Sequence, residues 1–87
     1  MTENRELKDA LKQLIIAECD ADLTADEIAD DEPLIGHELP FDSLDALQIC
    51  MAVQTRYGVR IEGGKATRRA LASINSLAET IRTAASA

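Results

Sequence analysis

Apolar residues recur at helical spacing near the start of the chain. They would share one face of a helix with about 3.6 residues per turn, and Glu18 continues the same spacing. The apolar members of this face are Leu7, Ala10, Leu11, Leu14 and Ile15. The pattern predicts an amphipathic helix over about residues 3–18.

The helical spacing then stops over residues 19–42, which are rich in Asp, Glu, Pro and Gly. A connection this long is uncommon in a small domain and usually has a function. Thr24 and Glu27 have the spacing of a capping box, which predicts one helical turn within the loop. We expect four apolar side chains to hold the loop against the core: Ile28, Leu34, Leu39 and Phe41.

A second helical pattern covers residues 43–57. Asp42 and Ser43 both suit a helix N-cap, and Asp45 suits the positive end of the helix dipole. Gly58 is expected to end the helix. The predicted inward face holds Ala46, Ile49, Val53 and Tyr57, and the apolar stripe widens at Leu47, Cys50 and Met51.

The last third of the chain predicts a short helix over residues 65–72 and a final helix after it. Gly63-Gly64 separates the short helix from a buried extended link at Val59 and Ile61. The N-cap of the final helix is either Ser73, or Ser76 in a capping box with Glu79. Its apolar face holds Ile74, Leu77, Ala78 and Ile81.

These patterns predict an all-α fold, a four-helix bundle with a long loop between helices 1 and 2 and a short helix 3. The 87 residues suit a single domain over residues 1–87. Phe41 and Tyr57 are the only aromatic residues, so the core must be aliphatic. An aliphatic core without bulky rings favours helices over a sandwich or barrel.

Charge is unevenly distributed along the chain. Residues 1–45 hold 14 acidic and 3 basic side chains, whereas residues 46–87 hold 2 acidic and 6 basic ones. An acidic first half repels nucleic acid and anionic lipid and attracts a partner with a basic patch. Taken one at a time, most of these carboxylates serve solubility.

The sequence has no run long enough to span a membrane, and its first twelve residues lack the apolar core of a signal peptide. Cys19 and Cys50 do not make a disulfide framework. We therefore expect a cytoplasmic monomer with reduced thiols.

Residues that could support catalysis or metal binding are few. His37 is the only histidine, and a single loop histidine is usually a solvated side chain rather than a catalytic base. Cys50 falls in an apolar helix and Cys19 lies near acids, which raise a thiol pKa, so neither is a good nucleophile. The acidic run from Asp20 resembles the start of an EF-hand loop but has Ala25 where the loop needs Gly. We predict no catalytic residue and no metal site.

Ser43 stands at the junction of the long loop and the second helix. The N-terminus of a helix offers unpaired N–H groups and partial positive charge, which suit a phosphodiester on this serine. On spacing alone, the alternative that Ser43 is only an N-cap is favoured, because capping serines are common.

The surrounding sequence changes this balance. The segment from Pro40 to Leu47 has Asp-Ser-Leu followed by an acidic residue at its centre. The similarity extends to Leu34-Ile35 and Leu39 before it, and to Met51-Ala52-Val53, Tyr57-Gly58-Val59-Arg60-Ile61 and residues 73–81 after it. In this frame the chain resembles the acyl carrier proteins.

The resemblance implies that a phosphopantetheinyl transferase, with Mg²⁺, moves a 4'-phosphopantetheine arm from coenzyme A to Ser43. The thiol of the arm would then carry thioester-bound acyl groups between the ketosynthase, dehydratase, reductase or acyltransferase enzymes of a lipid or polyketide pathway. Asp42 would contribute to transferase recognition and capping, and Leu44 to docking of the transferase and partner enzymes. The carrier itself would have no enzymatic activity.

Two further groups of residues follow from the resemblance. The outward face of the second helix is expected to dock partner enzymes through Asp45, Leu47, Gln48, Met51 and Arg56. Many relatives shield the acyl chain between helices two and four, where the candidate lining residues are Ala46, Ile49, Val53, Ile61, Ala70 and Leu77.

The chain also departs from the family pattern. Pro40 replaces the usual Gly two residues before the Asp, and Phe41 is larger than usual. Carriers of primary fatty acid synthesis crowd the second helix with glutamates, whereas here Asp45 is the only acid after the serine within residues 43–57. We therefore predict poor function with general fatty acid synthesis enzymes. Thr67-Arg68-Arg69 is similar to stand-alone carriers of specialised fatty acyl or polyene pathways.

Two alternatives stay open. Peptidyl or aminoacyl carriers tend to have a Gly-Gly pair and often His before the serine, where this chain has Phe41-Asp42. The second alternative is an unmodified helical interaction module in which Ser43 only caps a helix.

Overall fold

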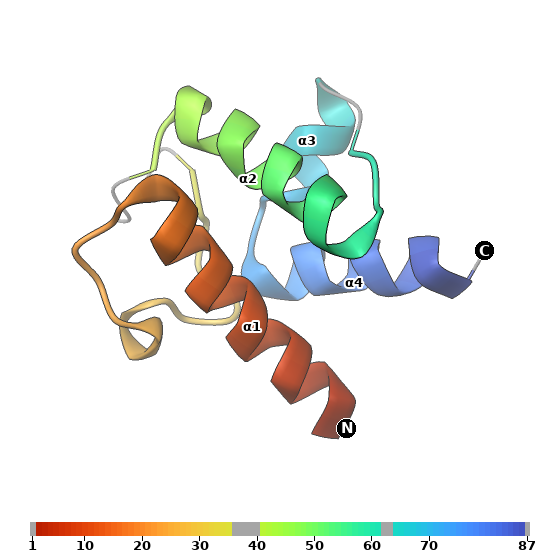
Figure 1. Cartoon of the computed structure of the whole chain (residues 1–87), viewed down its shortest axis with the longest axis horizontal. Helices are drawn as coiled ribbons and strands as arrows, with labels where there is room; N and C mark the ends of the chain where they lie inside the picture. Colours follow the sequence, from red (N-terminus) through yellow and green to blue (C-terminus); the bar gives the residue numbers. More distant parts are fainter. Residues whose placement is uncertain (1, 36–40, 62–63, 87) are drawn as a thin grey trace.

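The computed structural model describes residues 2–35, 41–61 and 64–86. Within these residues, every regular element is helical. The order is α1 (Thr2–Cys19), the 3₁₀ turn η1 (Ala25–Glu27), α2 (Ser43–Tyr57), α3 (Lys65–Ala70) and α4 (Ile74–Ser86). The predicted four-helix bundle with a long first loop and a short third helix is confirmed (Figure 1).

The helices pack around one aliphatic core. α1 lies against both α2 and α4, and α3 lies against α4 (Figure 1). The largest side chains that this packing removes from water are Leu11, Ile15, Ile28, Leu34, Ile49, Val53, Ile74 and Leu77. Burial of aliphatic surface is the main favourable term in folding, so these contacts fix the arrangement of the helices.

The helix ends follow local sequence signals. Gly58 adopts a left-handed conformation with φ of 69°, as a helix-ending glycine does, and its N–H donates to the Gln54 carbonyl. Ser73 precedes α4, and its Oγ accepts a hydrogen bond of 3.1 Å from the Ser76 N–H. Ser73 is therefore the cap of α4, and the alternative cap at Ser76 is wrong. The third helix ends at Ala70, two residues earlier than expected.

The long loop is attached to the core by apolar side chains. Ile28, Leu34 and Phe41 are buried, as predicted, and Leu39 lies outside the described residues. The expected capping box is present: the Thr24 N–H donates to Glu27 Oε1 at 2.9 Å, and η1 begins there. The loop therefore follows a defined path over the core up to Ile35.

Asp30 connects this loop to two helices. Its carboxylate pairs with Lys12 Nζ at 2.7 Å and with Lys8 Nζ at 3.8 Å, both on α1. Its backbone carbonyl accepts a hydrogen bond of 2.9 Å from the Asn75 N–H at the start of α4. The hydrogen bond from Lys12, together with the nearby positive charges, lowers the pKa of the Asp30 carboxyl.

We expect Asp30→Asn to lower the free energy of unfolding by up to about 1 kcal/mol near neutral pH, since the pairs are partly exposed. A carboxyl whose pKa is lowered in the folded state stabilises fully above its unfolded pKa, and this stabilisation is lost as the pH falls through the folded pKa. The difference between variant and wild type should therefore shrink towards about pH 2.5.

Urea unfolding followed by circular dichroism at both pH values measures this difference. Asp31→Asn is the matched control, because Asp31 is exposed and makes no ion pair with the described residues. An equal loss of stability for the two variants would contradict the role of Asp30.

Candidate functional site

The start of α2 is held by Asp42. Its backbone is extended, and its Oδ1 accepts hydrogen bonds from the N–H groups of Leu44 at 3.0 Å and Asp45 at 3.1 Å. The Asp42 N–H donates in return to Asp45 Oδ2 at 3.0 Å, which completes a capping box. Asp42 is the N-cap, and the alternative in which Ser43 caps the helix is wrong.

Ser43 is the first residue of α2, and its side chain is exposed. Because Asp42 satisfies the cap, no described residue hydrogen-bonds the Ser43 hydroxyl. An exposed hydroxyl at the positive end of a helix is accessible to an enzyme and suits a bound phosphate. The serine that the motif singles out is therefore available for modification.

The residue before this cap anchors the site to the core. Phe41 is buried, with 3% of its surface exposed, so the chain is fixed immediately before it turns into α2. Pro40 and His37, which the sequence also singled out, lie outside the described residues. The site is thus placed by one buried ring and one carboxylate cap.

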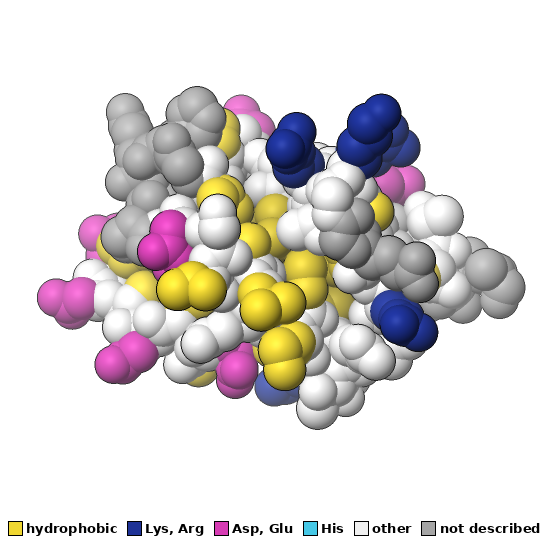
Figure 2. Space-filling model, turned by 90° about the horizontal axis from the view of Figure 1, so that it is seen from above, with side chains coloured by type: hydrophobic (Ala, Val, Ile, Leu, Met, Phe, Trp, Pro, Cys, Tyr) yellow, Lys and Arg dark blue, Asp and Glu magenta, His cyan; other side chains and the backbone are white. Residues whose placement is uncertain are grey.

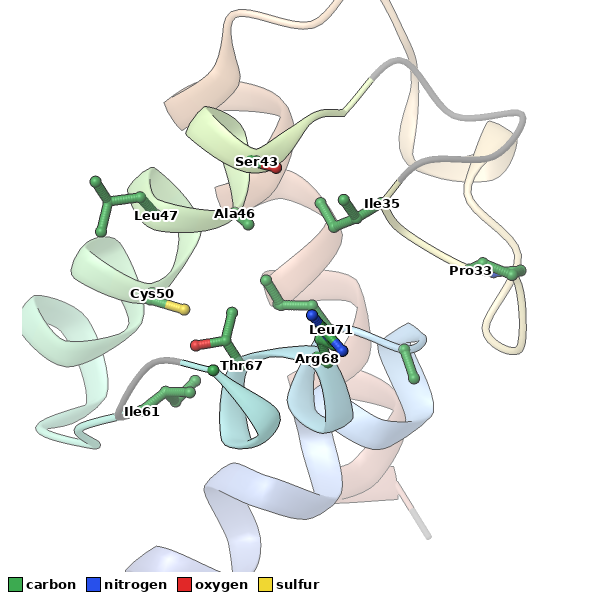
Figure 3. A pocket seen from close by; sticks show the side chains of 12 residues that line it. Pro33, Ile35, Ser43, Ala46, Leu47, Cys50, Ile61, Thr67, Arg68 and Leu71 are labelled. Carbon is green, nitrogen blue, oxygen red and sulfur yellow. The ribbon is translucent and has the colours of Figure 1, made fainter.

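A cavity of about 710 Å³ opens beside Ser43, between α2, α3 and the end of the long loop (Figure 3). Its volume is in the range of small-molecule sites, and its walls are mostly apolar. The lining residues are Pro33, Ile35, Ser43, Ala46, Leu47, Cys50, Ile61, Gly64, Thr67, Arg68, Leu71 and Ala72.

Two of the six residues expected around an acyl chain, Ala46 and Ile61, line this cavity. The other four lie in the packed core and do not line it: Ile49, Val53, Ala70 and Leu77. Among the described residues, none within α4 contributes to the cavity wall, which is built from the α3 side instead. Acyl binding by these residues stays a prediction.

The α3 side of the cavity was not predicted from the sequence. Gly64, Thr67, Arg68 and Leu71 are spaced i, i+3, i+4 and i+7, which places them on one face of a helix. This spacing was the available signal. The face is too short and too polar to be read as a wall before α2 is known to lie opposite it.

The two cysteines lie next to the site without being reactive. Burial raises the pKa of the Cys50 thiol, and a hydrogen bond with Thr67 across the cavity opposes this shift. The pKa of Cys19 is raised to about 11. The largest cause is burial, and the charge of Asp45 and its hydrogen bond with the thiol add to it. The expected direction for Cys19 is correct, and burial is its main cause. Both thiols stay protonated near neutral pH.

The outward side of α2 exposes large apolar side chains. Leu44 is 73% exposed, Leu47 58% and Met51 60%. Leu47 and Met51 were expected to widen the inward stripe, and the structure turns them to solvent instead. Figure 2 shows apolar side chains along the middle of one face, with acidic groups mainly on the left and basic groups mainly on the right.

The other expected docking residues differ in their surroundings. Gln48 and Arg56 are exposed on α2. Asp45 is half-buried, because its carboxylate completes the capping box with Asp42. Asp45 therefore mainly stabilises the start of α2, and only part of its side chain is open to a partner.

Among the described residues, no group of three or more His, Cys, Asp or Glu side chains lies close enough to hold a metal ion. None of the helices, over the described residues, combines the length and apolar character needed to cross a membrane.

Comparison with protein families identifies the family of the chain. The family model described as "Phosphopantetheine attachment site" matches residues 9–81. The chain belongs to this phosphopantetheine-binding family. No curated protein and no solved structure matches the chain.

Members of this family are carrier domains with a covalently attached 4'-phosphopantetheine group. They work with a phosphopantetheinyl transferase and pathway enzymes, and generally have no catalysis of their own. The start of α2 in this carrier fits the group, because it offers an exposed hydroxyl at a helix N-terminus beside a mostly apolar cavity.

The division of roles at the start of α2 can be tested through stability. We expect Asp42→Ala to lower the free energy of unfolding by about 1 kcal/mol, because two N–H groups lose their acceptor. Ser43→Ala should change it by less than about 0.5 kcal/mol, since the hydroxyl supports no contact among described residues.

Urea unfolding of the unmodified carrier measures both changes. Asp42→Asn is the control that keeps a capping oxygen and should recover most of the stability. A larger loss for Ser43→Ala than for Asp42→Ala would show that the serine, not the aspartate, is the cap.

Proposed function

We propose that this protein is an acyl carrier that bears its 4'-phosphopantetheine arm on Ser43. The observation that carries the proposal is the exposed Ser43 hydroxyl, free of the capping role, at the rim of a mostly apolar cavity in a chain of the phosphopantetheine-binding family. Under this proposal, residues 1–87 act as one carrier domain without enzymatic activity.

Attachment requires little chemistry from the carrier. The Ser43 oxygen attacks the phosphate next to pantetheine in coenzyme A, the bond to adenosine bisphosphate breaks, and the serine proton leaves. A transferase supplies the base and Mg²⁺. When bound, the arm supplies a thiol that holds the cargo as a thioester.

The surroundings of Ser43 favour a mobile arm. Asp42 already occupies the N–H groups of Leu44 and Asp45, so these donors cannot clamp the phosphate. The carboxylates of Asp42 and Asp45 lie beside Ser43 in the sequence and repel an anion, while the helix dipole attracts it. A weakly held phosphate allows the arm to move between the cavity and partner active sites.

The mostly apolar cavity supports an acyl cargo. The side chains of Ile35, Ala46, Ile61 and Leu71 offer hydrocarbon surface to an acyl chain that is held on the thiol of an arm attached to Ser43 (Figure 3). The Phe41-Asp42 pair before the serine also favours an acyl cargo over a peptidyl or aminoacyl one. The remaining members of the expected lining would contribute only if the core opened to a longer chain.

The exposed side of α2 supports docking of partner enzymes. This surface has large apolar side chains with neutral and basic neighbours. The enzymes of primary fatty acid synthesis bind glutamate-rich carriers, so this surface suits other partners. We propose a role in a specialised lipid or polyketide pathway, as a cytoplasmic monomer that binds no nucleic acid.

The attachment site has a direct test. After incubation with coenzyme A, Mg²⁺ and a broad-specificity transferase, intact-mass measurement should show a gain of one phosphopantetheine group. Ser43→Ala should show no gain. Thr55→Ala is the matched control, because Thr55 is another exposed hydroxyl residue on α2, and it should be modified like the wild type.

The same measurement separates the alternatives. No mass gain in the wild type would favour the unmodified interaction module. Loading of the holo-carrier by an amino acid adenylation enzyme, but not by acyl-activating enzymes, would favour a peptidyl carrier.

Docking through α2 is tested by the kinetics of this modification. Leu44 is exposed, so Leu44→Ser should leave the free energy of unfolding within about 0.5 kcal/mol of wild type. It should raise the transferase KM for the carrier roughly tenfold, because loss of one well-packed contact raises Kd by about that factor.

Gln54→Ser, on an exposed position late in the same helix, is the control and should leave KM unchanged. Equal KM values for the two variants would remove Leu44 from the docking surface.

A further inference from the structure

A thiol faces the same cavity as the proposed attachment serine. Of the described residues that line the cavity, only Cys50 has a sulfur atom, and Figure 3 shows this atom directed towards Thr67 on the α3 wall. Cys50 is only 8% exposed. Its thiol is therefore reached through the cavity, by a group narrow enough to enter it.

Cys50 and Ser43 lie on the same side of one helix. They are seven positions apart on α2, which corresponds to nearly two full turns and about 10 Å along the helix axis. A 4'-phosphopantetheine chain is about as long as a segment of four or five residues, and it spans roughly 15 Å when extended. An arm attached to Ser43 is thus long enough for its terminal thiol to reach Cys50.

We propose that Cys50 forms a reversible disulfide bond with the thiol of the arm, and so holds a cargo-free arm in the cavity under oxidising conditions. The inference rests on the proposed attachment at Ser43. An arm that carries a thioester has no free thiol, so only the unloaded carrier would be held. The oxidised carrier would accept no cargo until a reductant restored both thiols.

The reaction needs a small-molecule disulfide, such as oxidised glutathione, as the oxidant. Cys50 and the arm thiol each lose a proton and together lose two electrons, and the S–S bond between them forms. The S–S bond of oxidised glutathione breaks, takes up these two electrons and two protons, and yields two glutathione thiols. Thiol reductants reverse the same exchange.

The surroundings of Cys50 favour a tethered thiol over one in free solution. Burial raises the pKa of the Cys50 thiol, so it is unreactive towards reagents in solution. A flexible tether of this length gives the arm thiol a roughly millimolar effective concentration at Cys50, which offsets the low thiolate fraction. Cys19 is the competing thiol, but it is half-buried at the end of α1 and does not line the cavity.

The test uses the full chain with the arm attached, at low protein concentration and with attachment verified by intact mass. After treatment with oxidised glutathione, the wild type should lose the mass of two hydrogen atoms, and dithiothreitol should restore it. Cys19→Ser is the matched control and should behave in the same way, because Cys50 is then the only cysteine thiol of the chain.

Cys50→Ser and Cys50→Ala remove the thiol that faces the cavity and differ in the polarity that they leave there. In both variants we expect the product that lacks two hydrogen atoms to fall at least roughly tenfold, because the tethered reaction partner is gone. A glutathione adduct should accumulate in its place. Ser43→Ala, which cannot carry the arm, should not lose hydrogen.

Three results would overturn the inference, and they are distinguishable. If arm-bearing Cys19→Ser gains glutathione or forms dimers without losing two hydrogen atoms, the arm does not pair with Cys50. If the loss persists in Cys50→Ala and disappears in Cys19→Ser, the disulfide belongs to Cys19. Failure of Ser43 to gain mass on incubation with the transferase overturns the proposed function, and the inference with it.

Discussion

The burial of one face of α2 is the constraint on which the site depends. Ile49 and Val53 are fully excluded from water, and Ala46 and Cys50 are nearly so. A helix repeats about every 3.6 residues, so burial of this face also fixes the direction in which every other side chain of the helix points. The apolar side chains at positions 44, 47 and 51 must then face solvent, and residue 43 must stand at the exposed end.

The long loop also helps to hold the start of α2 in place. Ile28 and Leu34 insert into the core, and Asp30 attaches the loop to α1 and α4. Phe41 then buries its ring immediately before the Asp42 cap, so the chain enters α2 from a fixed point. A connection without these attachments would let the start of α2 fray, and the serine would lose its position at a helix terminus.

The site combines an exposed serine at a helix N-terminus with a mostly apolar cavity. Under the proposed attachment at Ser43, the carboxylates of Asp42 and Asp45 would discourage tight binding of the phosphate, which suits an arm that must leave the surface. The cavity provides hydrocarbon surface, and Arg68 adds a charge on the wall opposite the serine. Under the proposed attachment at Ser43, the mobility of the arm would depend on the start of α2, whereas α3 would contribute to the wall of the cavity.

Local signals determined much of this protein from sequence alone. The spacing of apolar residues and the turn and cap residues placed the helices, because these signals depend on neighbours within a few residues. The prediction for Ser43 also needed the resemblance over most of the chain, because its local signal alone favours a helix cap. Only the tertiary structure decided which candidate caps each helix, that Leu47 and Met51 face solvent, and that α3 rather than α4 faces Ser43 across the cavity. These features depend on how helices distant in sequence pack together, and the period of a single helix carries no information about the position of its neighbours.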